Sequence, residues 1–156
     1  MKPRVAVSAC LIGRLVRWDG THKLTAAVAR LDEVFELVEV CPEDEVGMGT
    51  PREPIKLDPQ RRLVGTRSKT DHTEAMRAFA ARRIAELGEI DGWIFKARSP
   101  SCGLWTVQVE GQGPVGRGTF SEVVTRLLPS LPVAEEDEVD DAFVERVRAH
   151  LRTRTV

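Results

Sequence analysis

Three cysteines are the residues of this sequence with the clearest capacity for chemistry. Cys10 and Cys41 each end an apolar run typical of a buried strand, and Cys102 lies a few residues beyond a third such run. In an open α/β sheet, the loops at the carboxyl ends of parallel strands converge on one crevice. The sequence therefore predicts that the three thiols meet at one site. Three thiolates without a fourth cysteine would leave one coordination position of a metal centre open.

The chemistry of sulfur restricts the metal at such a site. Thiolates favour zinc or iron–sulfur centres over hard ions such as magnesium and calcium. A structural zinc site normally closes with four protein ligands at short spacings, and none of the three cysteines has a Cys-X-X-Cys partner. Zinc with His22 or His72 as the fourth ligand stays open as an alternative, and so does an iron–sulfur centre. Three buried structural cysteines are the third interpretation, because free cysteine is often buried.

Length and composition describe an ordinary globular protein. The chain has 156 residues, of which 42% are hydrophobic and 30% charged, and its 23 basic and 24 acidic residues give a net charge of −1. This length suits one domain over residues 1–156, and the near-zero charge gives no bulk attraction for a polyanion. No apolar run reaches the roughly 20 residues of a membrane span. An odd cysteine count argues against a secreted disulfide framework, so we expect a cytoplasmic protein without a cleaved leader.

Alternating strands and helices are expected to position the cysteines. Apolar runs predict buried strands over residues 5–9, 35–40, 90–97 and 131–134. Amphipathic patterns and capping residues predict helices over residues 21–31, 73–87, 119–128 and 139–152. Residues 55–57 and 62–64 flank Asp58-Pro59-Gln60 as in a small hairpin, and residues 106–110 alternate like an edge strand. This order predicts an α/β fold, a Rossmann-like three-layer sandwich with a mostly parallel sheet and a small hairpin insertion.

Four separated motifs follow one another in a specific order. They are Val7-Ser8-Ala9-Cys10-Leu11-Ile12-Gly13 with Val16-Arg17-Trp18-Asp19-Gly20; Cys41-Pro42-Glu43 with Gly47 and Pro51-Arg52-Glu53-Pro54; Lys96-Ala97-Arg98-Ser99-Pro100-Ser101-Cys102-Gly103; and Gly116-Arg117-Gly118 before Phe120. Through these motifs the chain resembles a family of small bacterial proteins, long filed as a domain of unknown function, whose characterised members are thiouracil desulfidases. Residues 104–115 lack the Tyr/Asp-Gly pattern of that family.

The resemblance implies a cofactor and a reaction. The cofactor is a 4Fe-4S cluster held by Cys10, Cys41 and Cys102, with the fourth iron free to take sulfur from a substrate. The reaction is a non-redox desulfuration of a thiolated pyrimidine, a 2-thiouracil-type base or nucleotide, to uracil and hydrogen sulfide. An open iron acts as a Lewis acid and binds a soft sulfur leaving group.

Glu43 and Ser101 are the predicted catalytic residues. Glu43 lies two residues after a predicted ligand, where a carboxylate near a desolvated centre can activate water as a general base. An exposed loop glutamate is the plain alternative, and Asp44 and Glu45 are neighbouring candidates. Ser101 is expected to contact the substrate or relay a proton, although a serine in such a loop also commonly caps a turn.

Ser8, Trp18 and Ser99 are the predicted substrate contacts. Trp18 offers an aromatic face on which a planar base stacks. The cations expected around the crevice, able to accept the phosphate of a nucleotide or else simply solvated, are Arg17, Arg52, Lys96 and Arg98. The expected partner is a small thiolated base or nucleotide. Thiolated tRNA is less favoured, because it would need a local basic stripe.

A second class of function stays open beside the desulfidase. The chain could be a non-catalytic module, either a zinc-stabilised interaction domain or an iron–sulfur redox sensor. Two enzyme classes are disfavoured, because the sequence has neither the Gly-X-Ser-X-Gly pattern of serine hydrolases nor a Gly-X-Gly-X-X-Gly fingerprint after its first strand.

Overall fold

A parallel sheet forms the centre of the protein. The computed structural model describes residues 1–155, in which four parallel strands pair in the order β2-β1-β5-β8. These strands are β1 (Arg4–Ser8), β2 (Glu36–Val40), β5 (Gly92–Phe95) and β8 (Val133–Glu135). They correspond to the four buried strands expected from the sequence. Val156, the last residue of the predicted 1–156 domain, lies outside the described residues.

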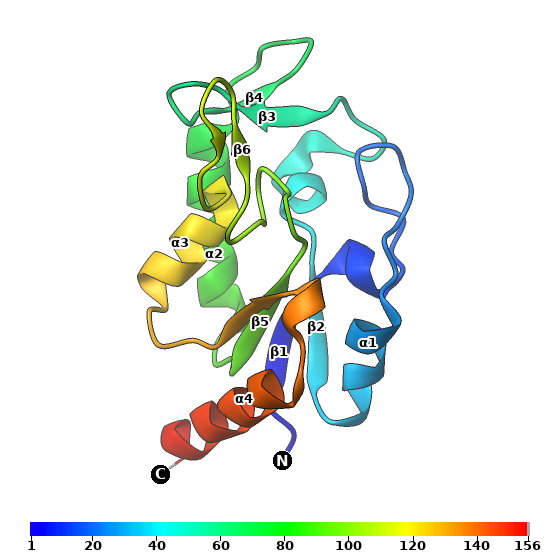
Figure 1. Cartoon of the computed structure of the whole chain (residues 1–156), viewed down its shortest axis with the longest axis vertical. Helices are drawn as coiled ribbons and strands as arrows, with labels where there is room; N and C mark the ends of the chain where they lie inside the picture. The colour runs from blue at the N-terminus through cyan, green and yellow to red at the C-terminus, as the bar shows by residue number, and fades with distance from the viewer. Residues whose placement is uncertain (156) are drawn as a thin grey trace.

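Helices cover both faces of this sheet (Figure 1). Within residues 1–155 they are α1 (Ala26–Ala29), α2 (Thr73–Leu87), α3 (Thr119–Leu127) and α4 (Asp141–Arg154). Successive side chains of a strand point to opposite faces. Accordingly Ala6 and Trp93 pack in the cluster that includes α2 and α3, whereas Val5, Val7 and Ile94 pack with α1 and α4. The predicted three-layer α/β sandwich is confirmed.

A smaller mixed sheet lies at the end of the molecule away from the two termini (Figure 1). Its strands, in the order β4-β3-β6-β7, are β3 (Ile55–Leu57), β4 (Leu63–Gly65), β6 (Gln108–Val109) and β7 (Gly113–Pro114). The antiparallel β3–β4 pair is the predicted hairpin. The expected edge strand over 106–110 shortens to two residues and joins β3, where pairing of Leu57 with Val109 buries both side chains. The hairpin is thus part of a second sheet.

The predicted helix over residues 21–31 is largely wrong. Only α1 is α-helical there, and a 3-10 turn follows it over Arg30–Glu33. The Thr25 N–H, which a helix from Thr21 would donate to the Thr21 carbonyl, donates instead to the carbonyl of Leu11 (2.9 Å), and the Lys23 N–H donates to that of Cys10 (2.9 Å). Residues 23–25 therefore run along the turn that carries Cys10.

The apolar residues Ala75, Phe79, Ile84 and Leu87 predict one buried face for α2, and the observed buried face differs from it in part. Phe79 and Leu87 are buried as expected, but Ala75 is exposed and Met76 and Ala80 pack into the core instead. Neighbouring helical positions differ by about 100°, so Met76 lies on the same side as Phe79 and Ala80. Across residues 1–155, the helices are too short or too polar to span a lipid bilayer.

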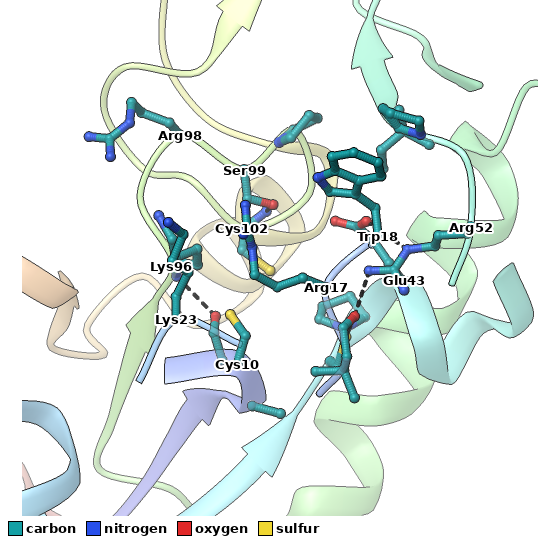
Figure 2. Close-up of a pocket in the computed structure, with 18 of the residues that line it drawn as sticks. Cys10, Arg17, Trp18, Lys23, Glu43, Arg52, Lys96, Arg98, Ser99 and Cys102 are labelled. Atoms are coloured by element: carbon teal, nitrogen blue, oxygen red, sulfur yellow. Dashed lines mark hydrogen bonds and ion pairs between the residues drawn. The ribbon is translucent and has the colours of Figure 1, made fainter. Parts of the chain in front are cut away.

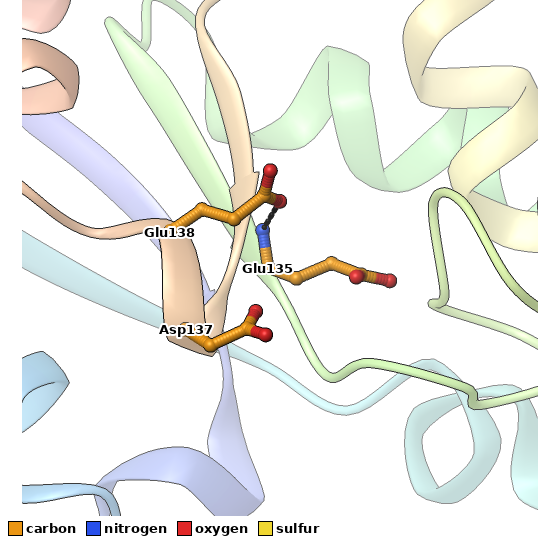
Figure 3. Close-up of side chains that lie close together, drawn as sticks. All are labelled: Glu135, Asp137 and Glu138. Carbon is orange, nitrogen blue, oxygen red and sulfur yellow. Dashed lines mark hydrogen bonds between the residues drawn. The ribbon is translucent and has the colours of Figure 1, made fainter.

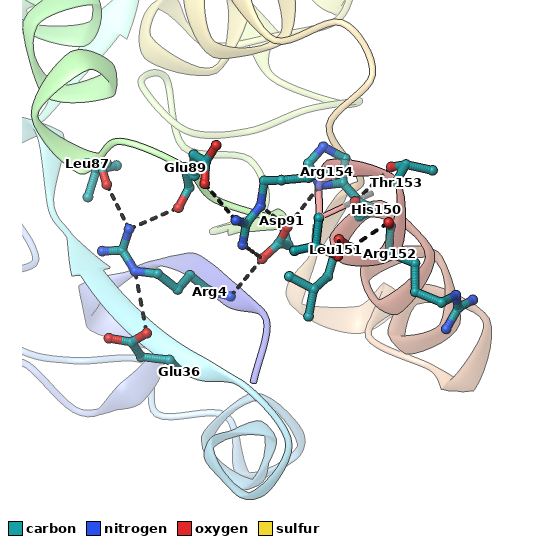
Figure 4. Close-up of polar contacts among 11 residues, drawn as sticks. Arg4, Glu36, Leu87, Glu89, Asp91, His150, Leu151, Arg152, Thr153 and Arg154 are labelled. Carbon is teal, nitrogen blue, oxygen red and sulfur yellow. Dashed lines mark hydrogen bonds and ion pairs between the residues drawn. The ribbon is translucent and has the colours of Figure 1, made fainter. Parts of the chain in front are cut away.

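Asp91 anchors α4 to the start of β5 (Figure 4). Its fully buried carboxylate accepts hydrogen bonds from Nε and Nη2 of Arg154 (2.9 and 2.8 Å) and from the Arg4 N–H (3.0 Å), and it lies 3.0 Å from His150 Nδ1. Burial by itself favours the neutral acid, but the hydrogen bonds from Arg154, His150 and Arg4 outweigh it. The pKa of Asp91 is therefore lowered.

Asp91→Asn is expected to lower the free energy of unfolding by about 3 kcal/mol at pH 7, because it removes one partner of a buried ion pair. A lowered pKa adds stability that is present above the ordinary value of 3.8 and is lost as pH falls through the folded-state value. Urea unfolding at pH 7 and pH 3 should therefore show a smaller difference between wild type and variant at pH 3.

The matched control for this substitution is Glu145→Gln on the same helix. Glu145 forms an exposed pair with Arg148, so its loss should change stability by less than about 1 kcal/mol. Equal unfolding midpoints for Asp91→Asn and Glu145→Gln at pH 7 would contradict the anchoring role of Asp91.

Candidate metal and substrate site

The strand order β2-β1-β5 brings three neighbouring strand ends to one edge of the sheet. Cys41 follows β2 directly, Cys10 lies in a 3-10 turn after β1, and Cys102 lies in the loop after β5. All three line one pocket of about 400 Å³, with Cys102 buried and the other two half-buried. Figure 2 shows Cys10 and Cys102 in this pocket. The predicted ligands therefore surround one space, and their binding of a metal stays a prediction.

Burial raises the pKa of all three thiols. The pKa of Cys41 rises to about 11, and that of Cys102 lies well above the ordinary value. Burial also raises the pKa of Cys10, although the charges of Lys96 and Arg17 oppose the effect. A thiol must lose its proton to bind a metal, so metal binding here would release protons. Three soft sulfur donors in a partly desolvated pocket fit an iron–sulfur centre.

The two histidines considered as zinc ligands do not belong to the described lining of this pocket. Nδ1 of His22 accepts a hydrogen bond from the Leu24 N–H (3.0 Å), and His72 directly precedes α2. Neither histidine is among the described residues that line the pocket. The geometry therefore does not favour a zinc site closed by histidine.

Glu43 lines the pocket and forms a buried ion pair. Its Oε1 lies 3.1 Å from Nε of Arg52, and the two side chains are 15% and 6% exposed, respectively. A carboxylate at this position is therefore inside the site, unlike the exposed loop glutamate of the plain alternative.

The neighbouring acids have other partners. Glu45 Oε2 accepts a hydrogen bond from the Cys41 N–H (2.6 Å), while Oε1 pairs with Arg83 of α2 (2.9 Å). Asp44 accepts a hydrogen bond from the Thr50 hydroxyl (2.9 Å). In the described part of the chain, neither acid lines the pocket. Glu45 thus positions the segment that carries Cys41.

The three predicted serines occupy different environments. Ser8 Oγ accepts a hydrogen bond from the Lys96 N–H (2.9 Å), and Ser99 Oγ accepts from the N–H groups of Ser101 and Cys102 (3.2 and 3.1 Å). Ser8 and Ser99 line the pocket. Ser101 is fully buried, is not one of the lining residues, and its hydroxyl has no hydrogen-bond partner among the described residues.

Carboxylates at the end of β8 support the loop that carries Cys102. Glu135 Oε2 accepts a hydrogen bond from the Leu104 N–H (2.9 Å), and Glu136 Oε1 accepts from the Ala97 N–H (2.6 Å). Figure 3 shows Glu135 beside Asp137 and Glu138. Glu138 accepts hydrogen bonds from the Glu135 N–H (2.9 Å) and from the indole of Trp105 (2.7 Å). These contacts hold both ends of the loop, and the sequence motifs gave no sign of them.

The start of α3 supports the same loop from another side. The N–H groups of Phe120 and Ser121 both donate to the carbonyl of Ser101, at 2.9 and 3.0 Å. A Cβ at Gly118 would lie 2.4 Å from the backbone carbon of Ser101. The glycine before α3 is therefore needed for the close approach of two backbones.

Basic side chains dominate the charge of the pocket. Five basic residues and one acidic residue line it, and the basic ones are Arg17, Lys23, Arg52, Lys96 and Arg98. Lys96 is paired with Glu136 (2.9 Å) and Arg52 with Glu43. Trp18, 41% exposed, also lines the pocket. Lys23 is the one cation of this set that the sequence motifs did not suggest.

The comparisons with known proteins agree with this arrangement. The chain matches the model of the 2-thiouracil desulfurase family over residues 5–136. It is 34% identical over 128 residues to YbbK of Bacillus subtilis (strain 168), described as uncharacterized, across 75% of this chain and 79% of YbbK. Its fold is similar to that of TudS, a [4Fe-4S]-dependent thiouracil desulfidase, with a TM-score of 0.73 and 27% identity across 97% of this chain and 99% of TudS.

The family match includes each part of the site. Residues 5–136 contain the three cysteines, the Glu43–Arg52 pair and the supports of the Cys102 loop from α3 and β8. The chain therefore belongs to the 2-thiouracil desulfurase family.

Proposed function

We propose that the protein removes sulfur from a thiolated pyrimidine, a 2-thiouracil-type base or nucleotide, without net redox change. Water supplies the oxygen of the product carbonyl and the two hydrogens of the hydrogen sulfide released. The observation that carries the proposal is the gathering of Cys10, Cys41 and Cys102 around one pocket that also contains Glu43. Membership of the family and similarity to the thiouracil desulfidase TudS support the same reaction. Residues 1–156 are proposed to form one catalytic domain.

The three cysteines would hold a 4Fe-4S cluster and leave one iron without a protein ligand. When bound, the cluster supplies a Lewis acid that polarises the thiocarbonyl sulfur of the substrate. The all-sulfur donor set and the burial of Cys102 support this assignment.

Glu43 is the proposed general base. It accepts a proton from the water that attacks the ring carbon next to the sulfur. Ser99 accepts backbone N–H groups through Oγ, which leaves its own hydroxyl hydrogen to donate to the pyrimidine. Ser8, whose side chain also hydrogen-bonds the Cys102 thiol, is proposed as a second contact. Trp18 is proposed to stack on the ring. A proton relay through Ser101 stays part of the proposal, and it requires the Cys102 loop to turn this hydroxyl towards the pocket.

The charge of the pocket supports a substrate that carries phosphate. Arg17, Lys23 and Arg98 line the pocket in addition to the cations of the two ion pairs. Guanidinium and ammonium groups form strong charge-assisted hydrogen bonds with phosphate oxygens. A thiolated nucleotide therefore fits these residues at least as well as a free base, and tRNA stays the less favoured substrate.

Protein purified without oxygen is expected to be brown, with broad absorption near about 400 nm and about four irons per chain. Cys10→Ala, Cys41→Ala and Cys102→Ala should each lose most of the iron, because each removes one of three protein ligands. Ser130→Ala, at an exposed position, is the control and should keep it. Stoichiometric zinc in place of iron would contradict the cluster assignment and favour a zinc-stabilised module.

Glu43→Gln is expected to keep the iron content and fold but lower the turnover number by about 10²–10⁴, because the amide cannot accept the proton from water. The measurement is the rate of sulfide release by cluster-replete protein. Glu110→Gln changes an exposed acid that pairs with Lys56 and should leave the rate unchanged. Near-native release by Glu43→Gln would transfer the role of base to Glu45 or Ser101.

Thiouracil, its nucleoside monophosphate and a thiolated tRNA should be compared as substrates at two salt concentrations. We expect sulfide release from the base and the nucleotide, with little salt dependence for the uncharged base, because its binding displaces no counterions. Activity confined to tRNA and falling steeply with salt would overturn the small-substrate assignment. No release from any of the three by cluster-replete protein would favour a redox sensor.

A further inference from the structure

Arg52 contacts more of the site than its ion pair with Glu43 alone. Nη2 donates to the carbonyl of Val16 (2.8 Å), Nη1 donates to the carbonyl of Gly49 (2.8 Å) and to the Thr50 hydroxyl (3.0 Å), and Nε donates to Glu43. The side chain is 6% exposed. Every nitrogen of the guanidinium group therefore has a partner, and burial leaves the side chain little freedom to rotate.

These bonds join two segments that come from different strands. Glu43 follows β2, whereas Val16 and Trp18 belong to the loop that follows the turn after β1. The backbone N–H of Arg52 also donates to the carbonyl of Trp18, at 2.7 Å. Figure 2 shows Arg52 beside Glu43 and Trp18. One residue thus fastens the proposed base and the loop that carries the proposed stacking residue.

The contact with Glu43 leaves the carboxylate able to react. Arg52 reaches Oε1 through Nε, and within the described residues Oε2 receives no hydrogen bond from the protein. This single hydrogen bond from Nε restricts the rotation of the carboxylate and leaves its second oxygen able to contact water. This is the arrangement that a base needs when it must be oriented and still accept a proton.

The pair also lies beside a predicted ligand, because Cys41, Glu43 and Arg52 line the same pocket. Val16, whose carbonyl accepts from Arg52, also has this carbonyl 3.8 Å from Cys41 Sγ. Removal of Arg52 would therefore leave an unpaired carboxylate next to the cysteine and release the loop that covers it.

We propose that Arg52 is the positioning residue of this site, which holds the Glu43 carboxylate and the Val16–Trp18 loop in one arrangement. The inference rests on the proposed function, in which Glu43 is the base. Lysine is a poor substitute, because its single ammonium group cannot replace three guanidinium nitrogens that donate to acceptors in different directions.

The test is a double-mutant cycle in the cluster-replete enzyme with Glu43→Gln, Arg52→Gln and the double variant. We expect Arg52→Gln alone to lower kcat about 10²-fold, but to lower it less than about 3-fold in the Glu43→Gln background, because Arg52 acts on kcat through Glu43. KM should rise in both backgrounds, because the Trp18 loop is released in both. Arg52→Lys should lie between wild type and Arg52→Gln.

A second measurement is independent of activity. Trypsin cleavage after Arg17 in the native protein should be about tenfold faster in Arg52→Gln than in wild type, because a released loop opens more often. Arg126→Gln, which removes an exposed arginine paired with Glu122 on α3, is the matched control and should behave as wild type in both measurements.

The outcomes separate this inference from the proposed function. Equal effects of Arg52→Gln on kcat in both backgrounds, or unchanged cleavage after Arg17, would overturn the positioning role. Absence of sulfide release from wild-type, cluster-replete enzyme would contradict the proposed function, whereas the cleavage assay would still report on the loop. If Arg52→Gln does not fold, Arg52→Lys replaces it in both measurements, and wild-type values for that variant would overturn the inference.

Discussion

The parallel pairing of β2, β1 and β5 is the constraint on which the rest of the site depends. Ser8 is paired with Val40, and Val7 with Ile94, so the three strands end at nearly the same level. Adjacent strands lie about 4.8 Å apart, so loops that leave three neighbouring strands start within roughly 10 Å of one another. Because Cys41 directly follows β2, it lies at the pocket without an intervening loop. Any sheet order that separated these strands would disperse the three cysteines over the edge of the sheet.

Cys102 depends on more of the fold than the other two cysteines do, because residues 101–104 around it are buried. Buried backbone groups need hydrogen-bond partners, and here they come from elements that are distant in sequence. The start of α3 donates to the carbonyl of Ser101, while Glu135 and Glu136 at the end of β8 accept from N–H groups on either side of the cysteine. The far strand of the sheet and its neighbouring helix therefore contribute to the site without lining the space between the sulfurs.

Local sequence patterns are sufficient to predict the strands. They also predict that the cysteines share one location, because Cys10 and Cys41 end apolar runs and Cys102 lies a few residues beyond another. These patterns do not predict hydrogen bonds between side chains and backbone groups of different segments. Nothing near Cys41 in sequence shows that Glu45 binds its N–H, and nothing near Arg52 shows that its bonds reach Val16. The helix expected over residues 21–31 is largely absent for a related reason, since the turn at Cys10 accepts the Thr25 N–H that this helix would use.

The site thus combines a rigid interior with an exposed rim. Cys102 and the Glu43–Arg52 pair are largely buried, and Arg52 is held by hydrogen bonds from each of its guanidinium nitrogens, whereas Trp18 and Arg98 are exposed to solvent. Arg52 should tolerate little change, because it also satisfies the backbone carbonyls of Val16 and Gly49. Positions on the rim can vary at small cost to the fold. Discrimination between a base and a nucleotide should therefore depend on the rim residues, while the desulfuration chemistry depends on the interior.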